Sequence, residues 1–231
     1  MPWYYYYDFS YLYFLIPSLI ITLIAQIAVK HAYSKYSGIL SRGRISGAEA
    51  AREVLRMNGV SGVQIERVAG NLTDHYDPRT NVIRLSSGVY DSSSIAAIGI
   101  AAHEAGHAVQ YDRSYFPIKI RSVILPITQI GSQLAWPLVL LGLVFETLTV
   151  LSLVGVILYG AVVLFQLITL PVEFNASRRA MEAIKAGNLL EAEEAKGARA
   201  VLSAAASTYL AAMLTAVLQL FRLMSLVRRR R

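Results

Sequence analysis

The sequence contains no cysteine among its 231 residues. This excludes disulfides, thiolate metal sites and cysteine nucleophiles, so a bound metal ion would have to be held by histidine, aspartate or glutamate. Charge is also scarce, because only 16% of the residues are charged while 55% are hydrophobic. The mean hydropathy is +0.46. This balance is unusual for a water-soluble domain and typical of a protein with several membrane spans.

The formal net charge is +7 and the isoelectric point is about 9.7. A basic protein can bind nucleic acid, but here the basic residues lie in segments beside apolar runs. Lysine and arginine retained next to membrane helices explain such a pattern more simply. We therefore expect a lipid bilayer as a partner and no nucleic acid.

Four apolar runs are each long enough to cross a bilayer with about 20 residues. They cover residues 9–29, 123–145, 148–170 and 200–221. The first follows an aromatic cluster, Trp3 and Tyr4 to Tyr7, which is suited to the headgroup level of a membrane. No basic residue precedes this run, so we expect a retained anchor and no cleaved signal peptide. Whether the fourth run spans is left open.

Residues 36–115 are polar enough to form a water-facing unit. A capping-box pattern at Ser46 and Glu49 predicts a helix that ends at Asn58-Gly59. Residues 64–68 and 81–85 are predicted to be short strands, separated by a turn-rich segment that contains His75. Serines 92–94 can cap a long helix over residues 94–111. The 81–85 strand could be an edge strand that binds an extended peptide.

The distribution of basic residues predicts the orientation in the membrane. Residues 30–122 carry twelve Lys or Arg, while residues 1–8 and 145–148 carry none. Because cytoplasmic loops are enriched in Lys and Arg, the polar unit should face the cytoplasm.

The segment His103-Glu104-Ala105-Gly106-His107 has the pattern His-Glu-x-x-His. Residues i and i+4 share one face of a helix, so both imidazoles can reach one zinc ion at about 2.0–2.1 Å. Glu104 can then act as the catalytic base that takes a proton from the attacking water. Histidine is scarce, with four in the chain, which favours a metal site over two coincidental helix histidines. Gly106 would let another backbone approach the motif.

A catalytic zinc ion usually has three protein ligands. The residues alone leave the third ligand open among His31, His75 and Glu173. His31 has basic neighbours, which disfavour a cation, and no third histidine follows the motif. Glu173 follows the third apolar run, where an unpaired acid is costly. It could also be an acid that starts a helix, favoured by the helix dipole.

Three segments together resemble the neutral zinc metallopeptidases of the YugP type. They are residues 103–110, residues 74–78 and the block Leu170-Pro171-Val172-Glu173-Phe174-Asn175-Ala176-Ser177-Arg178-Arg179-Ala180. The resemblance covers nearly the whole chain and implies one catalytic zinc ion, with Glu173 as the third ligand, as in gluzincins. More distantly, the layout is similar to HtpX-type and CAAX prenyl proteases.

These families place an orienting aspartate two or four residues after the ligand glutamate. Asn175 and Ser177 stand at those positions here, and hydrogen bonds from them could take over that role. Further candidate donors to a developing oxyanion are His75, Tyr209, Arg178 and Arg179.

The expected fold is a mainly helical membrane protein with three to four transmembrane helices and a small α+β zincin-like metal-binding unit. The expected parts are an anchor (1–30), a cytoplasmic metallopeptidase unit (31–122), a transmembrane hairpin (123–170), a helix with the third ligand (171–199), and an apolar helix with a basic tail (200–231).

The expected function is a membrane-bound zinc endopeptidase that acts on polypeptides near the cytoplasmic face. One alternative is an intramembrane protease of the site-2 type, which takes a late aspartate as ligand, although no aspartate follows Asp112. The other alternative is a non-catalytic membrane scaffold.

Overall fold

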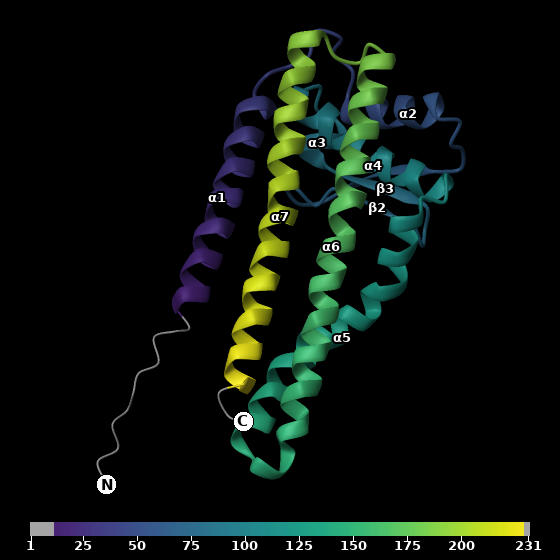
Figure 1. Ribbon diagram of the computed structural model, residues 1–231. Coiled ribbons are helices and arrows are strands. Elements are labelled where there is room, and N and C mark those ends of the chain that lie inside the picture. The colour runs from purple at the N-terminus through teal and green to yellow at the C-terminus, as the bar shows by residue number, and fades with distance from the viewer. Residues whose placement is uncertain (1–11, 229–231) are drawn as a thin grey trace. The chain divides into compact units, whose positions relative to one another are not determined.

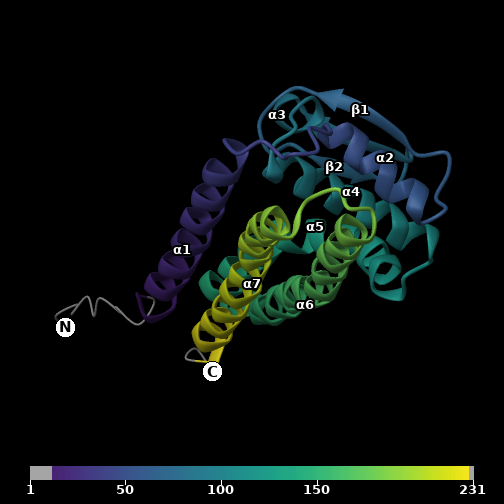
Figure 2. The same ribbon diagram turned by 90° about the horizontal axis from the view of Figure 1, so that it is seen from above.

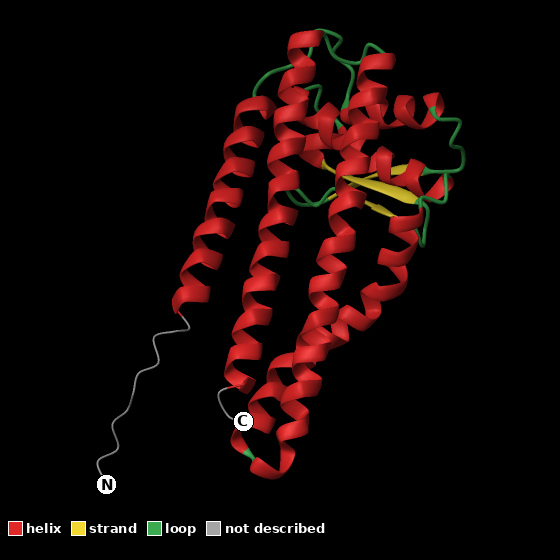
Figure 3. Cartoon of the chain, viewed as in Figure 1, coloured by secondary structure: helices red, strands yellow, loops and turns green. Residues whose placement is uncertain are grey.

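The computed structural model describes residues 12–228 (Figure 1). Helices dominate this range, and three short strands form one small sheet (Figure 3). Four of the described helical segments are long and apolar enough to cross a membrane, namely Leu12–Ser37, Phe116–Val144, Glu146–Ala186 and Ala192–Arg228. The predicted fold class is therefore confirmed. The aromatic cluster at Trp3 to Tyr7 and the last three arginines lie outside the described residues.

The chain divides into two compact units. The first, which we call the span unit, comprises Met1–Ile24, Ser122–Leu167 and Leu210–Arg231. The second, which we call the site unit, comprises Ala25–Arg121 and Ile168–Tyr209. Helices α1 (Leu12–Ser37), α5 (Phe116–Val144), α6 (Thr149–Ala186) and α7 (Ala192–Arg228) each contribute residues to both units.

Within the span unit, a short 3₁₀ turn at Glu146–Leu148 joins α5 to α6, the two helices of the expected hairpin. The two helices approach closely at Gly155, where an added Cβ would lie 2.6 Å from the carbonyl oxygen of Ala135. Because small residues allow backbones to come together inside membranes, this glycine permits the hairpin to pack tightly.

Helix α6 continues without a break through Pro171 to Ala186. Proline removes one backbone hydrogen bond from a helix, and membrane helices tolerate this loss. The helix ends at Ala186, directly before Gly187 and Asn188.

Within the site unit, α2 (Gly47–Met57) begins with the predicted capping box. Ser46 Oγ accepts a hydrogen bond from the Glu49 amide at 3.2 Å, and the Glu49 carboxylate accepts one from the Ser46 amide at 2.6 Å. The helix ends at Met57 with Asn58 as its C-cap, and Gly59 follows with a φ of +67°, which glycine adopts without strain.

The sheet has the strand order β1-β3-β2, with β1 (Gln64–Val68) parallel and β2 (His75–Asp77) antiparallel to β3 (Val82–Ser86). The prediction of residues 81–85 as an edge strand is therefore wrong, because β3 is paired on both sides. His75 also lies in a strand and not in a turn. A three-residue strand is too short to show the alternating pattern that reveals longer strands.

Helix α4 (Ile95–Asp112) forms the centre of the site unit, and most of its residues are buried. Ser94 caps it by accepting a hydrogen bond from the Ala97 amide at 3.2 Å, as predicted. The helix packs against α2, α3 (Ser87–Tyr90), β2 and β3, and shares a hydrophobic core with Ile184 of α6 and Leu202 of α7. Figure 2 shows α2, β1 and β2 gathered around α4. The element that carries the His-Glu-x-x-His pattern is thus held rigidly from several sides.

Candidate metal centre

His103 and His107 lie one turn apart on α4, with their rings edge to face and their centroids 4.7 Å apart. Helix α6 brings Glu173 to the same place from a distant part of the sequence. One ligand atom from each of the three residues lies within 4.8 Å of the others. The structure thus assembles two imidazoles and one carboxylate that could bind a metal ion.

The spacing of these atoms fits a tetrahedral metal. Glu173 Oε2 lies 3.3 Å from Nε2 of His103 and 3.4 Å from Nε2 of His107. Zinc bonds of about 2.0–2.1 Å at tetrahedral angles place neighbouring ligand atoms about 3.4 Å apart. Among the described residues, this buried oxygen has no hydrogen-bond partner. Because an unsatisfied buried polar atom is costly, a cation bound between the three residues would remove that cost.

Gly106 makes this approach of the two helices possible. A Cβ at this position would lie 2.8 Å from the carbonyl oxygen of Ala176 on α6. The prediction that Gly106 admits another backbone is confirmed, and that backbone belongs to the helix that carries Glu173.

The charges around the three residues favour a cation. Burial alone would lower the pKa of the His107 imidazole. However, the interaction with Glu173 and the negative charges of Glu104 and Glu173 outweigh burial, so this pKa is raised above its ordinary value. Arg121 balances the second carboxylate oxygen, with Nη1 3.4 Å from Glu173 Oε1. The surroundings of His107 therefore stabilise positive charge.

Each histidine also has a partner on its other ring nitrogen. Ser177 Oγ lies 3.1 Å from Nδ1 of His103, and Gln110 Oε1 lies 3.0 Å from Nδ1 of His107. Such partners hold a ring in place and leave Nε2 available to a metal ion. Asn175 is linked to His107 through Gln110, because its Oδ1 accepts a hydrogen bond from Gln110 Nε2 at 3.0 Å.

Glu104 is buried next to the histidines and is oriented by the sheet. The backbone amide of Tyr76 in β2 donates a hydrogen bond to Glu104 Oε2 at 3.0 Å. The edge strand β2 therefore fixes the direction of this carboxylate, which shares a cavity with His103 and Glu173.

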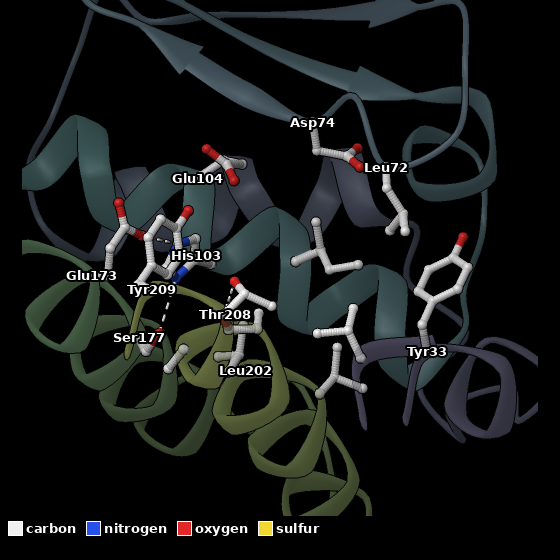
Figure 4. Close-up of a pocket in the computed structure, with 15 residues that line it drawn as sticks. Tyr33, Leu72, Asp74, His103, Glu104, Glu173, Ser177, Leu202, Thr208 and Tyr209 are labelled. Atoms are coloured by element: carbon white, nitrogen blue, oxygen red, sulfur yellow. Dashed lines mark hydrogen bonds and ion pairs between the residues drawn. The ribbon is translucent and has the colours of Figure 1, made fainter. Parts of the chain in front are cut away.

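The cavity has a volume of about 220 Å³. At one end it is lined by Glu104, His103, Glu173, Ser177 and Tyr209, whereas Tyr33 and Leu72 lie toward the other end (Figure 4). Most of the remaining wall is apolar, formed by Val29, Ile100, Val201, Leu202, Ala205 and Ala206. The polar cluster thus opens into a space that suits an apolar side chain.

Of the other candidate residues within the described range, only Tyr209 lies at the metal-ligand group. Tyr209 lines the cavity with His103 and Glu173. His75 is exposed, with its Nδ1 2.8 Å from the carbonyl oxygen of Thr73, and neither it nor His31 belongs to the described metal-ligand group. Arg178 lies 3.8 Å from Glu182, while Arg179 donates to Asn175 Oδ1 at 2.8 Å.

Three contacts had not been assigned a role from the sequence, namely those of Gln110, Arg121 and the amide of Tyr76. Gln110 lies three residues after His107, so helical spacing could have indicated that they share a face. For Arg121 and the Tyr76 amide the sequence contains no such signal, because both contacts join elements far apart in the chain.

The fold and the site define a helical protein with candidate membrane spans and a buried group of two histidines and one glutamate. Comparison with known families places residues 11–228 in a family described as "putative neutral zinc metallopeptidase", and the chain belongs to this family. The chain is also 45% identical over 207 residues to the "putative membrane protease YugP" of Bacillus subtilis (strain 168), covering 90% of this chain and 92% of the relative. No solved structure gives a significant match. The family implies zinc as the metal.

Proposed function

We propose that the protein is a membrane-bound zinc-dependent endopeptidase of the gluzincin type, with His103, His107 and Glu173 as ligands and Glu104 as the general base. The observation that carries this proposal is the position of Glu173 Oε2, which is 3.3 and 3.4 Å from two imidazole nitrogens and has no described hydrogen-bond partner. A zinc ion bound there would polarise the scissile carbonyl and lower the pKa of water to about 7.

Glu104 is suited to the proton transfers of peptide hydrolysis. Its carboxylate lines the cavity beside His103, and Tyr76 holds one of its oxygens from the sheet. We propose that Glu104 takes the proton of the attacking water and later gives it to the leaving amine. Tyr209, on the same cavity, is the candidate donor to the oxygen of the scissile carbonyl.

The cavity wall favours substrates with an apolar residue next to the scissile bond. Val201, Leu202 and Ile100 give the cavity a largely apolar wall, which suits such a residue of the substrate. We propose that the substrate is a polypeptide near the cytoplasmic face of the membrane, because residues 30–122 carry twelve basic residues.

The test is peptide hydrolysis by detergent-purified protein with and without zinc, beside the Glu104→Gln variant. The variant should keep its zinc and lose about 10²- to 10⁴-fold in kcat, which is the usual contribution of a general base. Glu53→Gln, which changes a half-buried glutamate on α2 that pairs with Arg56, is the matched control and should hydrolyse peptides like the wild type.

Retained hydrolysis in Glu104→Gln would rule out the role of this residue. If the wild type binds zinc and cleaves no peptide, and the Glu104→Gln variant still performs the cellular role of the protein, the endopeptidase proposal gives way to a non-catalytic scaffold.

A further inference from the structure

A continuous chain of hydrogen bonds leads from α6 to the second histidine of the motif. Arg179 Nε donates to Asn175 Oδ1 at 2.8 Å, and Gln110 Nε2 donates to the same oxygen at 3.0 Å. Gln110 Nε2 also donates to the backbone carbonyl oxygen of Val172 at 2.8 Å. The remaining amide atom, Gln110 Oε1, lies 3.0 Å from Nδ1 of His107.

The direction of this chain is set by two groups that cannot exchange roles. A guanidinium only donates hydrogen bonds, and a backbone carbonyl oxygen only accepts them. Arg179 therefore holds Asn175 with Oδ1 toward Gln110. Asn175 Oδ1 and the Val172 carbonyl together require the NH₂ group of Gln110 on their side, so Gln110 presents only its oxygen to His107.

We propose that Gln110 is the positioning residue for His107, and that this chain from Arg179 through Asn175 holds the ring with Nδ1 protonated and Nε2 free to bind the metal ion. Gln110 is fully buried, so no water can replace a lost partner. Turning its amide over would place an oxygen against two acceptors and an NH₂ group against the Nδ1 hydrogen of His107. The inference rests on the proposed metal site and adds the residues that prepare it.

The hydrogen-bond partner of His103, unlike Gln110, does not have a fixed direction. Ser177 Oγ lies 3.1 Å from Nδ1 of His103, but a hydroxyl group can either donate or accept a hydrogen bond. Ser177 holds the ring without determining which nitrogen carries the proton. The two histidines are therefore held by different groups, an amide and a hydroxyl. Variants of Gln110 and Ser177 can test the two contacts one at a time.

The experiment uses the full-length protein in detergent, with ¹⁵N-labelled histidine and bound zinc. The chain has only four histidines, so long-range ¹H–¹⁵N spectra resolve each ring, and competition with a chelator measures the zinc affinity. In Gln110→Met, which keeps the length of the side chain, the Nδ1 hydrogen of His107 should lose its hydrogen bond, and its chemical shift should change accordingly. The zinc affinity should fall about 10- to 100-fold, as is usual for a lost outer partner. The signals of His103 should stay unchanged. In Ser177→Ala, the signals of His103 should change and those of His107 should stay unchanged.

A second pair of variants tests the link through Asn175, and it remains decisive if Gln110→Met does not fold. Asn175→Asp can only accept from Gln110 and Arg179, so it should keep the His107 signal and the zinc affinity of the wild type. Asn175→Leu has a similar size but no acceptor, so it should weaken both. A purely structural role at this buried site would favour leucine over a carboxylate.

An unchanged His107 signal and unchanged affinity in Gln110→Met, with zinc bound by the wild type, would overturn this inference alone. Equal effects on His103 and His107, or equal behaviour of Asn175→Asp and Asn175→Leu, would also overturn it and leave Gln110 a packing residue. A wild type that binds no zinc would overturn the metal site itself and this inference with it.

Discussion

The backbone amide of Tyr76 donates a hydrogen bond to Oε2 of Glu104 across 3.0 Å. Tyr76 lies in an edge strand, and its amide points away from β3 to Glu104 of α4, the proposed base. A catalytic carboxylate must be held in one orientation to take a proton efficiently. The small sheet therefore serves the proposed reaction by orienting Glu104.

Removing this amide should slow hydrolysis without removing the metal. Proline has no N–H group and is tolerated at the free edge of a sheet. A hydrogen bond to a charged group is worth about 1.5–3 kcal/mol, so Tyr76→Pro should lower kcat about ten- to a hundredfold while zinc stays bound. Kinetics and metal analysis of the purified variant measure both quantities.

The matched control is Tyr76→Ala, which also loses the side chain but keeps the amide. Both variants remove the contacts of the Tyr76 side chain with Asn81 and Tyr111. Equal kcat values in the two variants would mean that the amide does not orient Glu104.

Glu173→Gln should lose the metal. The substitution keeps the shape of the side chain but removes the negative charge, which Arg121 also contacts at 3.4 Å. Because loss of an outer partner already costs about 10- to 100-fold in metal affinity, loss of a ligand should cost more than about 100-fold. Glu182→Gln, an exposed glutamate on the same helix, should bind zinc like the wild type. Zinc retained at full affinity in Glu173→Gln would reopen the choice of third ligand.

Gly106→Ala should destabilise the protein. The new Cβ would lie 2.8 Å from the carbonyl oxygen of Ala176, and a backbone atom cannot move aside as a flexible side chain can. Overpacking of this kind costs about 1–3 kcal/mol, so the unfolding temperature should fall and zinc affinity should drop as α6 shifts. In Gly160→Ala the new Cβ meets no atom within 4 Å, so this variant should unfold like the wild type. A normal unfolding temperature in Gly106→Ala would show that α4 and α6 tolerate a wider separation.

Asp77 should contribute stability that depends on pH. The Arg79 amide, the Thr80 hydroxyl and the Arg84 guanidinium lower the pKa of this carboxyl from 3.8 to about 2. A carboxyl with a depressed pKa in the folded state stabilises the fold above its unfolded pKa, and this contribution disappears as the pH falls through the folded value. Asp77→Asn should therefore lower the unfolding temperature at pH 6, and the difference from the wild type should shrink between about pH 4 and pH 2. A difference that is the same at pH 6 and pH 2.5 would contradict this prediction.

The local elements were predictable because their signals are local. The capping box at Ser46 and Glu49, the cap at Ser94 and the stop at Asn58 each depend on residues within one helical turn. The strand β2 was missed because three residues show no periodicity, and β3 was taken for an edge because strand order depends on pairing between distant segments.

The sequence by itself determined that thiolate chemistry is excluded, that several helices can cross a membrane, and that His103 and His107 share a helix face with Glu104 between them. These conclusions follow from composition and from spacings of a few residues. Only the tertiary structure decided that Glu173 Oε2 meets both Nε2 atoms, that the Tyr76 amide holds Glu104, and that Gln110 joins His107 to Asn175. Each of these contacts joins elements that are brought together by packing around Gly106 and the core of α4, and packing depends on all the elements at once.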